Sequence, residues 1–444
     1  MKTETMSVPN SYLRDFTGTD TGSDTPGPAW LSSLRQSAAE KFAEVGFPTR
    51  RDEEWRFTNV SPIAETPFTL ATKAQSELSP EGLSRFTYED MQGTQLVFVN
   101  GHFAADLSSK TFPGGVTVAT LASAMANNSA LVEKHLGKSA KFETESFVAL
   151  NTAALEDGAF VHIAAGAIIT APIHLLFVST ANSGPTVSHP RTLVIVEENS
   201  QMTLIESYAG PAGQVYFTNA VTEVVVSENA VVDHYKVQRE SEKAYHIATM
   251  QVALARSANF SSHSIGLGGL LIRNDINAYL GGEGIECTLN GVYLGKDKQV
   301  FDNHTSIDHA MPHCNSHEIY KGILNDYSRG VFNGKIFVRE DAQKTDAKQT
   351  NQTLLLSPYA QIDTKPQLEI FADDVKCTHG ATIGQLNAEA LFYLRARGIK
   401  KEDARALLTY AFASDIVSRI KVDAIRSQLD RVLLAERALE GIAQ

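Results

Sequence analysis

The spacing of hydrophobic and polar positions changes twice along the chain. Helical spacing predicts a helix from Trp30 to about Val45 and further helix from Thr117 to about Leu155. From Glu156 to Gly384, short segments alternate apolar and polar residues, as strands with one buried face do. Helical spacing then returns up to the last residues, with Asn387 as the predicted N-cap of the first helix.

The alternating region contains a repeated unit in which a small or polar turn leads into a strand. The octets that show it begin at Glu156, Glu198, Glu228, Arg256, Gly282, Tyr327 and Pro358. Their start positions lie 26 to 45 residues apart, which is too irregular for a propeller or a leucine-rich repeat. Such units are typical of a parallel β-solenoid, and the absence of a hexapeptide rhythm favours the right-handed form.

We therefore predict a mainly β protein with helical ends: a right-handed parallel β-helix flanked by N-terminal and C-terminal α-helical regions. Residues 1–155 form a mobile N-terminus of about 27 residues and a helical domain with a β-hairpin at Asn100-Gly101. Residues 156–384 form the β-helix core, and residues 385–444 form a C-terminal helical domain. The apolar stripe of the last helices suits either a small bundle or a docking platform for a partner.

Composition narrows the function classes. The net charge of −12 argues against binding to nucleic acid, which requires clustered cations. The first residues show no secretory signal, and three cysteines in 444 residues fit a reducing compartment, so we expect a cytoplasmic protein. The apolar run from Phe160 to Val178 contains Pro172 and His174, and two buried strands explain it better than a membrane span.

The first candidate for chemistry is the pair Cys377 and His379. Two residues apart on a predicted strand, both side chains point to the same face. A thiolate and an imidazole there could bind a metal or form a nucleophile and base. The alternative is a buried cysteine beside a hydrogen-bonded histidine. Because structural zinc needs four ligands and catalytic zinc three, the pair is at most part of a metal site, which a second subunit could complete.

A second candidate is the segment DNHTSIDHAMPHCNSH, which would make the chain a stand-alone metal-binding protein. It contains Cys314 and the histidines His304, His309, His313 and His317. These spacings match no standard zinc motif, and a solenoid would spread the side chains over several faces. A third hypothesis, a right-handed β-helix carbohydrate-active enzyme, needs grouped carboxylates, for which only scattered residues such as Asp302 and Asp308 are available.

One stretch carries a family resemblance. The sequence FNGKIFVREDAQKTDAKQTNQTLLLSPYAQIDTKPQLEIFADDVKCTHGATIG (Phe332 to Gly384), followed by LFYLRARGI (Leu391 to Ile399), resembles the core of the SufB/SufD family of iron–sulfur cluster assembly proteins. The segments TSIDHAMPHCNSHEIYKGIL (Thr305 to Leu324) and RDEEWRFT (Arg51 to Thr58) also fit that family. Cysteine-poor in its N-terminal half, the chain is similar to the SufD branch rather than the SufB branch.

The resemblance implies a non-catalytic scaffold subunit that works with a SufB-like paralogue and a SufC-like ABC ATPase. It implies that a transient iron–sulfur cluster forms between the two related subunits, with His379 as a ligand shared with a SufB cysteine and Cys377 as a weaker candidate. The C-terminal helices would dock the ATPase. A reduced flavin is associated with the full complex, although the sequence contains no legible flavin motif, and a homodimer is plausible for the isolated chain.

Overall fold

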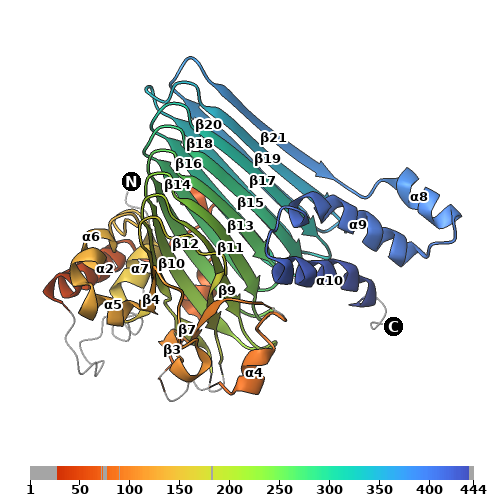
Figure 1. Ribbon diagram of the computed structural model, residues 1–444. Coiled ribbons are helices and arrows are strands. Elements are labelled where there is room, and N and C mark those ends of the chain that lie inside the picture. Colours follow the sequence, from red (N-terminus) through yellow and green to blue (C-terminus); the bar gives the residue numbers. More distant parts are fainter. Residues whose placement is uncertain (1–27, 72, 74–77, 90, 182–183, 440–444) are drawn as a thin grey trace.

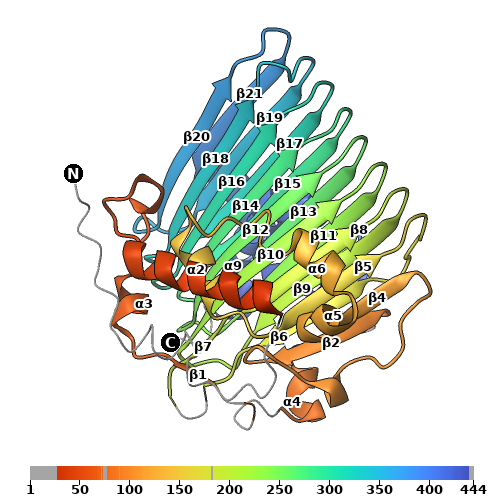
Figure 2. The same cartoon turned by 90° about the vertical axis from the view of Figure 1, so that its left-hand side faces the viewer.

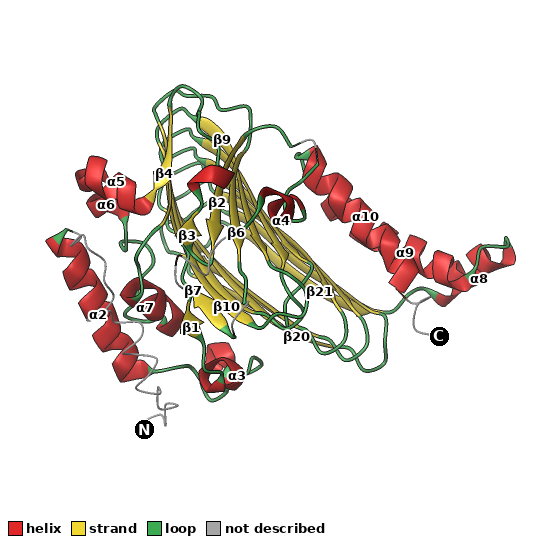
Figure 3. Ribbon diagram, turned by 90° about the horizontal axis from the view of Figure 1, so that it is seen from below, coloured by secondary structure: helices red, strands yellow, loops and turns green. Residues whose placement is uncertain are grey.

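The computed structural model describes residues 28–71, 73, 78–89, 91–181 and 184–439, and it is built around a parallel β-solenoid (Figure 1). The predicted class, mainly β with helices at both ends, is confirmed. Most helices of the N-terminal part lie on one side of the solenoid, and the C-terminal helices lie on the other (Figure 3). The predicted mobile stretch of about 27 residues lies outside the described residues.

Strands are the most abundant regular elements of the described residues, and most of the helices lie before or after the long run of strands. The strands are β1 (Thr69–Leu70), β2 (Thr94–Val99), β3 (His102–Phe103), β4 (Val116–Thr120), β5 (Gly158–Ile163), β6 (Ile173–Val178), β7 (Thr186–Ser188), β8 (Arg191–Val196), β9 (Gln201–Ala209), β10 (Tyr216–Val226), β11 (Val231–Arg239), β12 (Tyr245–Leu254), β13 (Asn259–Gly266), β14 (Leu271–Leu280), β15 (Glu286–Gly295), β16 (Val300–His309), β17 (Asn315–Leu324), β18 (Arg329–Val338), β19 (Asp346–Leu355), β20 (Gln361–Ile370) and β21 (Lys376–Gly384). The helices are α2 (Ala29–Val45), η1 (Glu53–Trp55), α3 (Ser61–Glu65), α4 (Pro80–Ser84), η3 (Ala105–Leu107), α5 (Leu121–Asn127), α6 (Ser129–His135), α7 (Ser146–Ala153), α8 (Ala388–Ala396), α9 (Lys401–Val417) and α10 (Asp423–Leu439).

Two sheets face each other, and the chain alternates between them (Figure 2). The first runs in the order β20-β18-β16-β14-β12-β10-β8-β5-β4, and the second in the order β21-β19-β17-β15-β13-β11-β9-β6-β2-β3. In the second sheet, register partners from Gln201 to Lys376 are 27 to 31 residues apart in sequence. Coils of nearly equal length therefore stack directly on one another.

This regular coil corrects the irregular spacing of the predicted repeat units. The octets that begin at Glu198, Glu228, Arg256 and Gly282 lead into strands of the second sheet, whereas those at Glu156, Tyr327 and Pro358 lead into strands of the first. The sequence pattern combined two different corners of the same coil. Counted at one corner alone, the repeat is regular.

The corner that leads into the second sheet requires a left-handed backbone conformation at one residue in most coils. The φ angles there are 56° at Asn199, 57° at Asn229, 55° at Ser257, 72° at Gly284, 59° at His313 and 63° at Lys344. Asn and Gly adopt this conformation at low cost, which explains the polar, small residues at the start of each predicted unit. The Asn229 amide also donates a hydrogen bond of 3.2 Å to Asn199 Oδ1 in the coil below.

A buried ion pair attaches the N-terminal helices to the first sheet. Arg191 Nη2 lies 2.5 Å from Glu223 Oε2, and both side chains are fully buried. Glu223 also accepts hydrogen bonds from the backbone N–H groups of Gly137, Ser139 and Ala140, just after α6. The carboxylate thus holds the loop after α6 against the outer face of β10.

On the other side, α9 and α10 pack on the outer face of the second sheet. Apolar side chains of both helices, among them Ile416 and Leu429, form one buried cluster with strand residues such as Tyr235 and Ile323. Lys421 Nζ, between the helices, donates to Asp233 Oδ2 at 2.8 Å. The α8 helix contributes no buried residue and extends away from the sheet (Figure 1).

Several local predictions are confirmed. The first helix is α2, the Asn100-Gly101 hairpin joins β2 and β3, and the run from Phe160 to Val178 forms β5 and β6. The side chain of Asn387 accepts the Ala390 N–H and caps α8. The prediction of helix from Thr117 was wrong for residues 117–120, because that segment forms β4 and pairs antiparallel with β5. No helix in the described parts of the chain is long and apolar enough to cross a membrane.

Replacing Leu429 with Ala should detach the C-terminal helices. Leu429 is 1% exposed in the cluster under α10, so its truncation should cost about 2–5 kcal/mol of stability. Hydrogen exchange should show faster exchange in α9 and α10 while the solenoid strands stay protected. Leu434→Ala is the matched control, because Leu434 lies in the same helix with 45% exposure and should change stability little. Equal effects of the two variants would contradict this packing.

Candidate functional site

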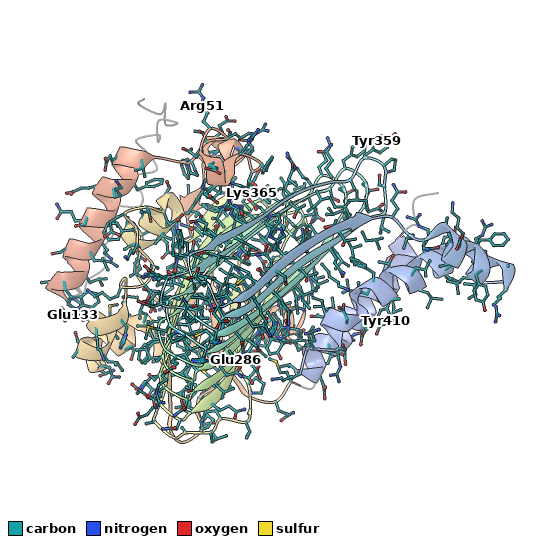
Figure 4. The ribbon with its side chains drawn as sticks, turned by 90° about the horizontal axis from the view of Figure 1, so that it is seen from above. Arg51, Glu133, Glu286, Tyr359, Lys365 and Tyr410 are labelled. Atoms are coloured by element: carbon teal, nitrogen blue, oxygen red, sulfur yellow. The ribbon has the colours of Figure 1, made fainter. Side chains whose placement is uncertain are left out.

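The solenoid ends at two unprotected strands. Among the described residues, β20 and β21 each have a strand neighbour on one side only. At the other end, the short antiparallel strands β3 and β4 close the sheets. The residues of β20 and β21 are half-buried or exposed throughout, and Tyr359 lies at the turn before β20 (Figure 4). We call this end, formed by β20 and β21, the open end.

Cys377 and His379 both lie on β21, at positions that face the interior of the solenoid. Cys377 pairs in register with the buried Ala347 and packs against a cluster that includes Ile336 and Val338. Burial raises the pKa of the Cys377 thiol above its ordinary value, which favours the protonated, packing form. His379 shares that face by alternation, as predicted, yet its side chain is exposed because no further coil covers it.

The register continues from His379 into the interior. His379 pairs with Gln349 on β19, which pairs with Glu318 on β17. Gln349 and Glu318 are 2% and 1% exposed, and Gln349 Nε2 donates to Glu318 Oε2 at 2.8 Å. Burial raises the pKa of Glu318 to about 7. Sequence reasoning missed Glu318 and Gln349, because no local motif shows which residues stack on His379.

A larger charged network lies deeper inside the solenoid. His234 Nε2 is 3.0 Å from Glu206 Oε2, and Lys236 Nζ donates to Asn274 Oδ1 at 2.7 Å. Burial lowers the pKa of Lys236 to about 8. Although burial alone would raise the pKa of Glu206, the hydrogen bond and charge of His234 and the charge of Lys236 hold it below its ordinary value. Charged residues at alternate positions of β11 were the available signal, and sequence analysis did not use it.

The histidine-rich segment does not form a common site. His304 lies on the outer face of β16, while His309 lies on its inner face and makes a 2.9 Å hydrogen bond to Ser316 Oγ. His313 occupies a corner and His317 lies on the outer face of β17. Cys314 is buried and its Sγ lies 3.2 Å from the Gly282 carbonyl oxygen. In the described parts of the chain, no group of three or more His, Cys, Asp or Glu side chains is arranged to hold a metal ion.

His304 instead fastens the N-terminal segment to the first sheet. Its Nε2 lies 3.0 Å from Asp302 Oδ1 and its Nδ1 lies 3.3 Å from Glu54 Oε2. Arg273 adds an ion pair of 3.0 Å to Asp302, and its guanidinium lies 3.8 Å from the Trp55 ring centroid. The segment RDEEWRFT thus has a structural role. Lys365 of β20, labelled in Figure 4, pairs with Glu53 of the same segment.

The carboxylates considered for sugar chemistry do not form a pair. Asp302 and Asp308 both face outward on β16, six residues apart, which corresponds to about 20 Å along a strand. A glycosidase needs two carboxylates within about 10 Å. Asp302 is also held by His304 and Arg273, and Asp308 is paired with Arg339.

The C-terminal helices present exposed apolar side chains on the surface away from the sheet. Phe392 and Tyr393 of α8 are 74% and 55% exposed, and Leu407 of α9 and Leu434 of α10 are each 45% exposed. Exposed large apolar and aromatic side chains of this kind are typical of protein interfaces.

Comparison with known proteins defines the class. The family model described as the SufBD core domain of the SUF system for FeS cluster assembly matches residues 177–412. The model of the SufBD protein N-terminal region matches residues 6–175. The chain therefore belongs to the SufBD family of iron–sulfur cluster assembly proteins.

Individual relatives place the chain close to one branch of that family. It is 36% identical over 408 residues to an iron–sulfur cluster assembly SufBD family protein of Synechocystis, covering 90% of this chain and 89% of the relative. It is 31% identical over 400 residues to the iron–sulfur cluster assembly protein SufD of Escherichia coli, covering 90% of this chain and 91% of that protein. The SufD protein of Bacillus subtilis is 26% identical over 446 residues, with 96% and 98% covered.

The contacts of His304 predict a loss of stability in alkaline solution. Its partners raise the His304 pKa from 6.5 to about 9, despite burial, so this stabilisation is complete below about pH 6.5 and is lost as the pH rises through 9. Asp302 behaves in the opposite sense: its pKa is lowered from 3.8 to about 2, so its contribution is lost only in strong acid. The difference in unfolding free energy between the unchanged chain and His304→Gln, in which the contributions of other titrating groups such as Lys236 cancel, should fall by on the order of 2 kcal/mol between pH 6 and pH 9.5.

The variant His304→Gln should lose that alkaline fall, whereas His317→Gln, on the outer face of the other sheet, should show the same pH profile as the unchanged chain. Burial also raises the pKa of Glu145, near Arg273, to about 7, so part of the slope below pH 7 should persist in both variants. An unaltered slope above pH 7 in His304→Gln would contradict the assigned role.

Proposed function

We propose that this chain is a non-catalytic scaffold subunit of a SufBCD-type assembly complex, working in the cytoplasm with a SufB-like paralogue and a SufC-like ABC ATPase. The observation that carries the proposal is the position of His379. It lies on an inward-facing position of the last strand, yet it is exposed because the solenoid stops there. A second solenoid placed against this end would enclose the imidazole between the two subunits.

The open end supports a partner of the same architecture. Long strands with unpaired backbone groups are templates for pairing, and natural proteins protect such edges. β20 and β21 are ten and nine residues long, and exposed apolar residues lie at the same end: Ile370, Phe371 and Ile383, with 40%, 59% and 50% exposure. A related solenoid can continue both sheets and bury these residues. The same reasoning allows a homodimer when the chain is isolated.

Within this interface, His379 is proposed as the ligand that this chain supplies to a nascent iron–sulfur cluster, which is the cargo of the complex. A neutral imidazole binds iron in clusters that also have thiolate ligands. The paralogue would supply a cysteine thiolate. Cys377 is the weaker candidate, because it packs inward and burial raises its pKa. No residue is assigned to the reduced flavin expected in the full complex.

The surface of α8, α9 and α10 is the proposed docking site for the ATPase. Its exposed aromatic residues suit a protein partner, and Lys321 on the outer face of β17 connects α9 to the sheet through an ion pair of 2.6 Å with Asp415. Strand β17 belongs to the same sheet as β21. A movement of the helices driven by the ATPase would therefore reach the open end through strands β17 and β19.

Replacing His379 with Ala should lower iron and sulfide loading of the reconstituted complex at least tenfold without dissociating it, because one cluster ligand is lost. Anaerobic reconstitution followed by iron and sulfide analysis and size-exclusion chromatography measures both effects. His317→Ala is the matched control, since it removes an imidazole from the outer face of a strand in the same sheet. Cys377→Ser should have the milder effect. Unchanged loading in His379→Ala would exclude the ligand role.

The two proposed interfaces can be separated by a crossed pair of variants. Phe392→Asp should weaken ATPase binding at least tenfold and leave binding of the paralogue intact, because Phe392 projects from α8. Phe371→Asp, at the open end, should do the reverse. Pull-down of each purified partner measures both. If Phe392→Asp released the paralogue, or Phe371→Asp released the ATPase, the assignment of surfaces would be wrong.

A further inference from the structure

Glu318 lies inside the solenoid without a neighbouring cation. Its side chain is 1% exposed on the interior face of β17, and it forms no ion pair with any residue that the structure describes. Two other buried carboxylates have a basic partner: Glu206 has His234 at 3.0 Å and Glu240 has His246 at 2.9 Å. A buried carboxylate is costly unless it is neutralised, so Glu318 requires either a bound proton or a bound cation.

Gln349 creates a second acceptor beside it. Its Nε2 donates to Glu318 Oε2 at 2.8 Å, and this hydrogen bond fixes which end of the amide faces the carboxylate. Oε1 of Gln349 and Oε1 of Glu318 then have no hydrogen-bond partner of good geometry among the described residues, and the Thr305 hydroxyl of β16 lies close enough to Glu318 to lower its pKa. Asn351, on the same interior face of β19, has a further unpartnered Oδ1. Three oxygen acceptors from two adjacent strands are thus buried in the interior, and the donor nearest to Glu318 besides Gln349 is the Thr305 hydroxyl.

The oxygens lie close to the open end. His379 is in register with Gln349, and Gln349 with Glu318, so two strand spacings separate Glu318 from the exposed edge, roughly 10 Å. The Asn351 amide donates to Thr364 Oγ1 of β20 at 3.0 Å, so polar groups from both sheets face the interior at this level. Along this register His379 lies nearest the open end and Glu318 farthest from it.

We propose that Glu318 and Gln349 form an inner binding site for a divalent first-row metal ion, Fe²⁺ in the assembly complex, from which the ion reaches His379. A carboxylate and an amide oxygen are ligands for such ions, and the imidazole of His379 is a ligand type for iron. The remaining positions of the ion would be filled by water. This inference rests on the proposed function, because it makes Fe²⁺ the ion that is handed over.

The competing explanation is a Glu318 carboxyl that simply keeps a proton and binds nothing. The metal-site and bound-proton explanations predict different results when the negative charge at Glu318 is removed or a second carboxylate is added beside it. Glu318→Gln keeps the shape and removes the charge, so it abolishes a metal site and leaves a proton-holding site folded. Gln349→Glu adds a second carboxylate. This strengthens metal binding if a metal site is present, and it destabilises the fold if no metal binds.

The test is anaerobic equilibrium dialysis of the full-length chain against Fe²⁺, with folding followed by circular dichroism. We expect one ion per chain, a loss of affinity of at least tenfold in Glu318→Gln, and a gain of about tenfold in Gln349→Glu measured in the presence of the ion. Glu206→Gln is the matched control, since that interior carboxylate already has a basic partner, and its Fe²⁺ binding should equal that of the unchanged chain.

The inner site would be overturned if the unchanged chain bound no Fe²⁺. It would also be overturned if Glu318→Gln bound Fe²⁺ as tightly as the unchanged chain and Gln349→Glu bound it no more tightly. If His379→Ala were the only one of these variants to lose Fe²⁺ binding, the inner site would again be overturned, and His379 would remain a ligand. If instead Glu318→Gln lost the ion but His379→Ala left cluster loading of the complex unchanged, the inner site would stand and the proposed role of His379 would fail.

Discussion

Backbone hydrogen bonding between coils is the constraint on which this structure depends. Each strand of the solenoid obtains its partners from the coils above and below, so stacking can stop only where something else satisfies the last strand. Short antiparallel strands do this at the N-terminal end, where β3 pairs with β2 and β4 with β5. At the C-terminal end the described chain leaves β20 and β21 without such a partner and turns into α8 instead. His379 is exposed because no further coil covers the open end.

The interior of the solenoid shows a second departure from a simple apolar column. Aliphatic and aromatic side chains fill much of the interior, but Glu206, His234, Lys236 and Glu318 occupy interior positions among them. Buried charges rarely increase stability compared with apolar residues of the same shape. Glu206 is neutralised by His234 and Lys236, whereas Glu318 has no ionic partner among the described residues.

The alternation of residues was sufficient to predict the solenoid, its helical ends and the shared orientation of Cys377 and His379. It could not predict which residues of successive coils lie side by side. Each strand neighbour of His379 is about 30 residues further back in the sequence, and the lengths of the corners between strands decide the register. The sequence pattern therefore could not predict that Gln349 and Glu318 lie in line with His379. Likewise, His304 and His309 are five residues apart on one strand, so they point to opposite faces, and only the folded coil shows that one holds the N-terminal segment while the other is buried inside.

The central claim is that the open end becomes a cluster site when a related solenoid closes it. Pulsed electron paramagnetic resonance of the reduced cluster in the assembled complex, with ¹⁵N-labelled histidine in this chain alone, tests it most directly. The account predicts a nitrogen hyperfine coupling from a directly bound imidazole, which disappears in the intact complex carrying His379→Ala. No histidine coupling from this chain, or the same coupling in the variant, would contradict it.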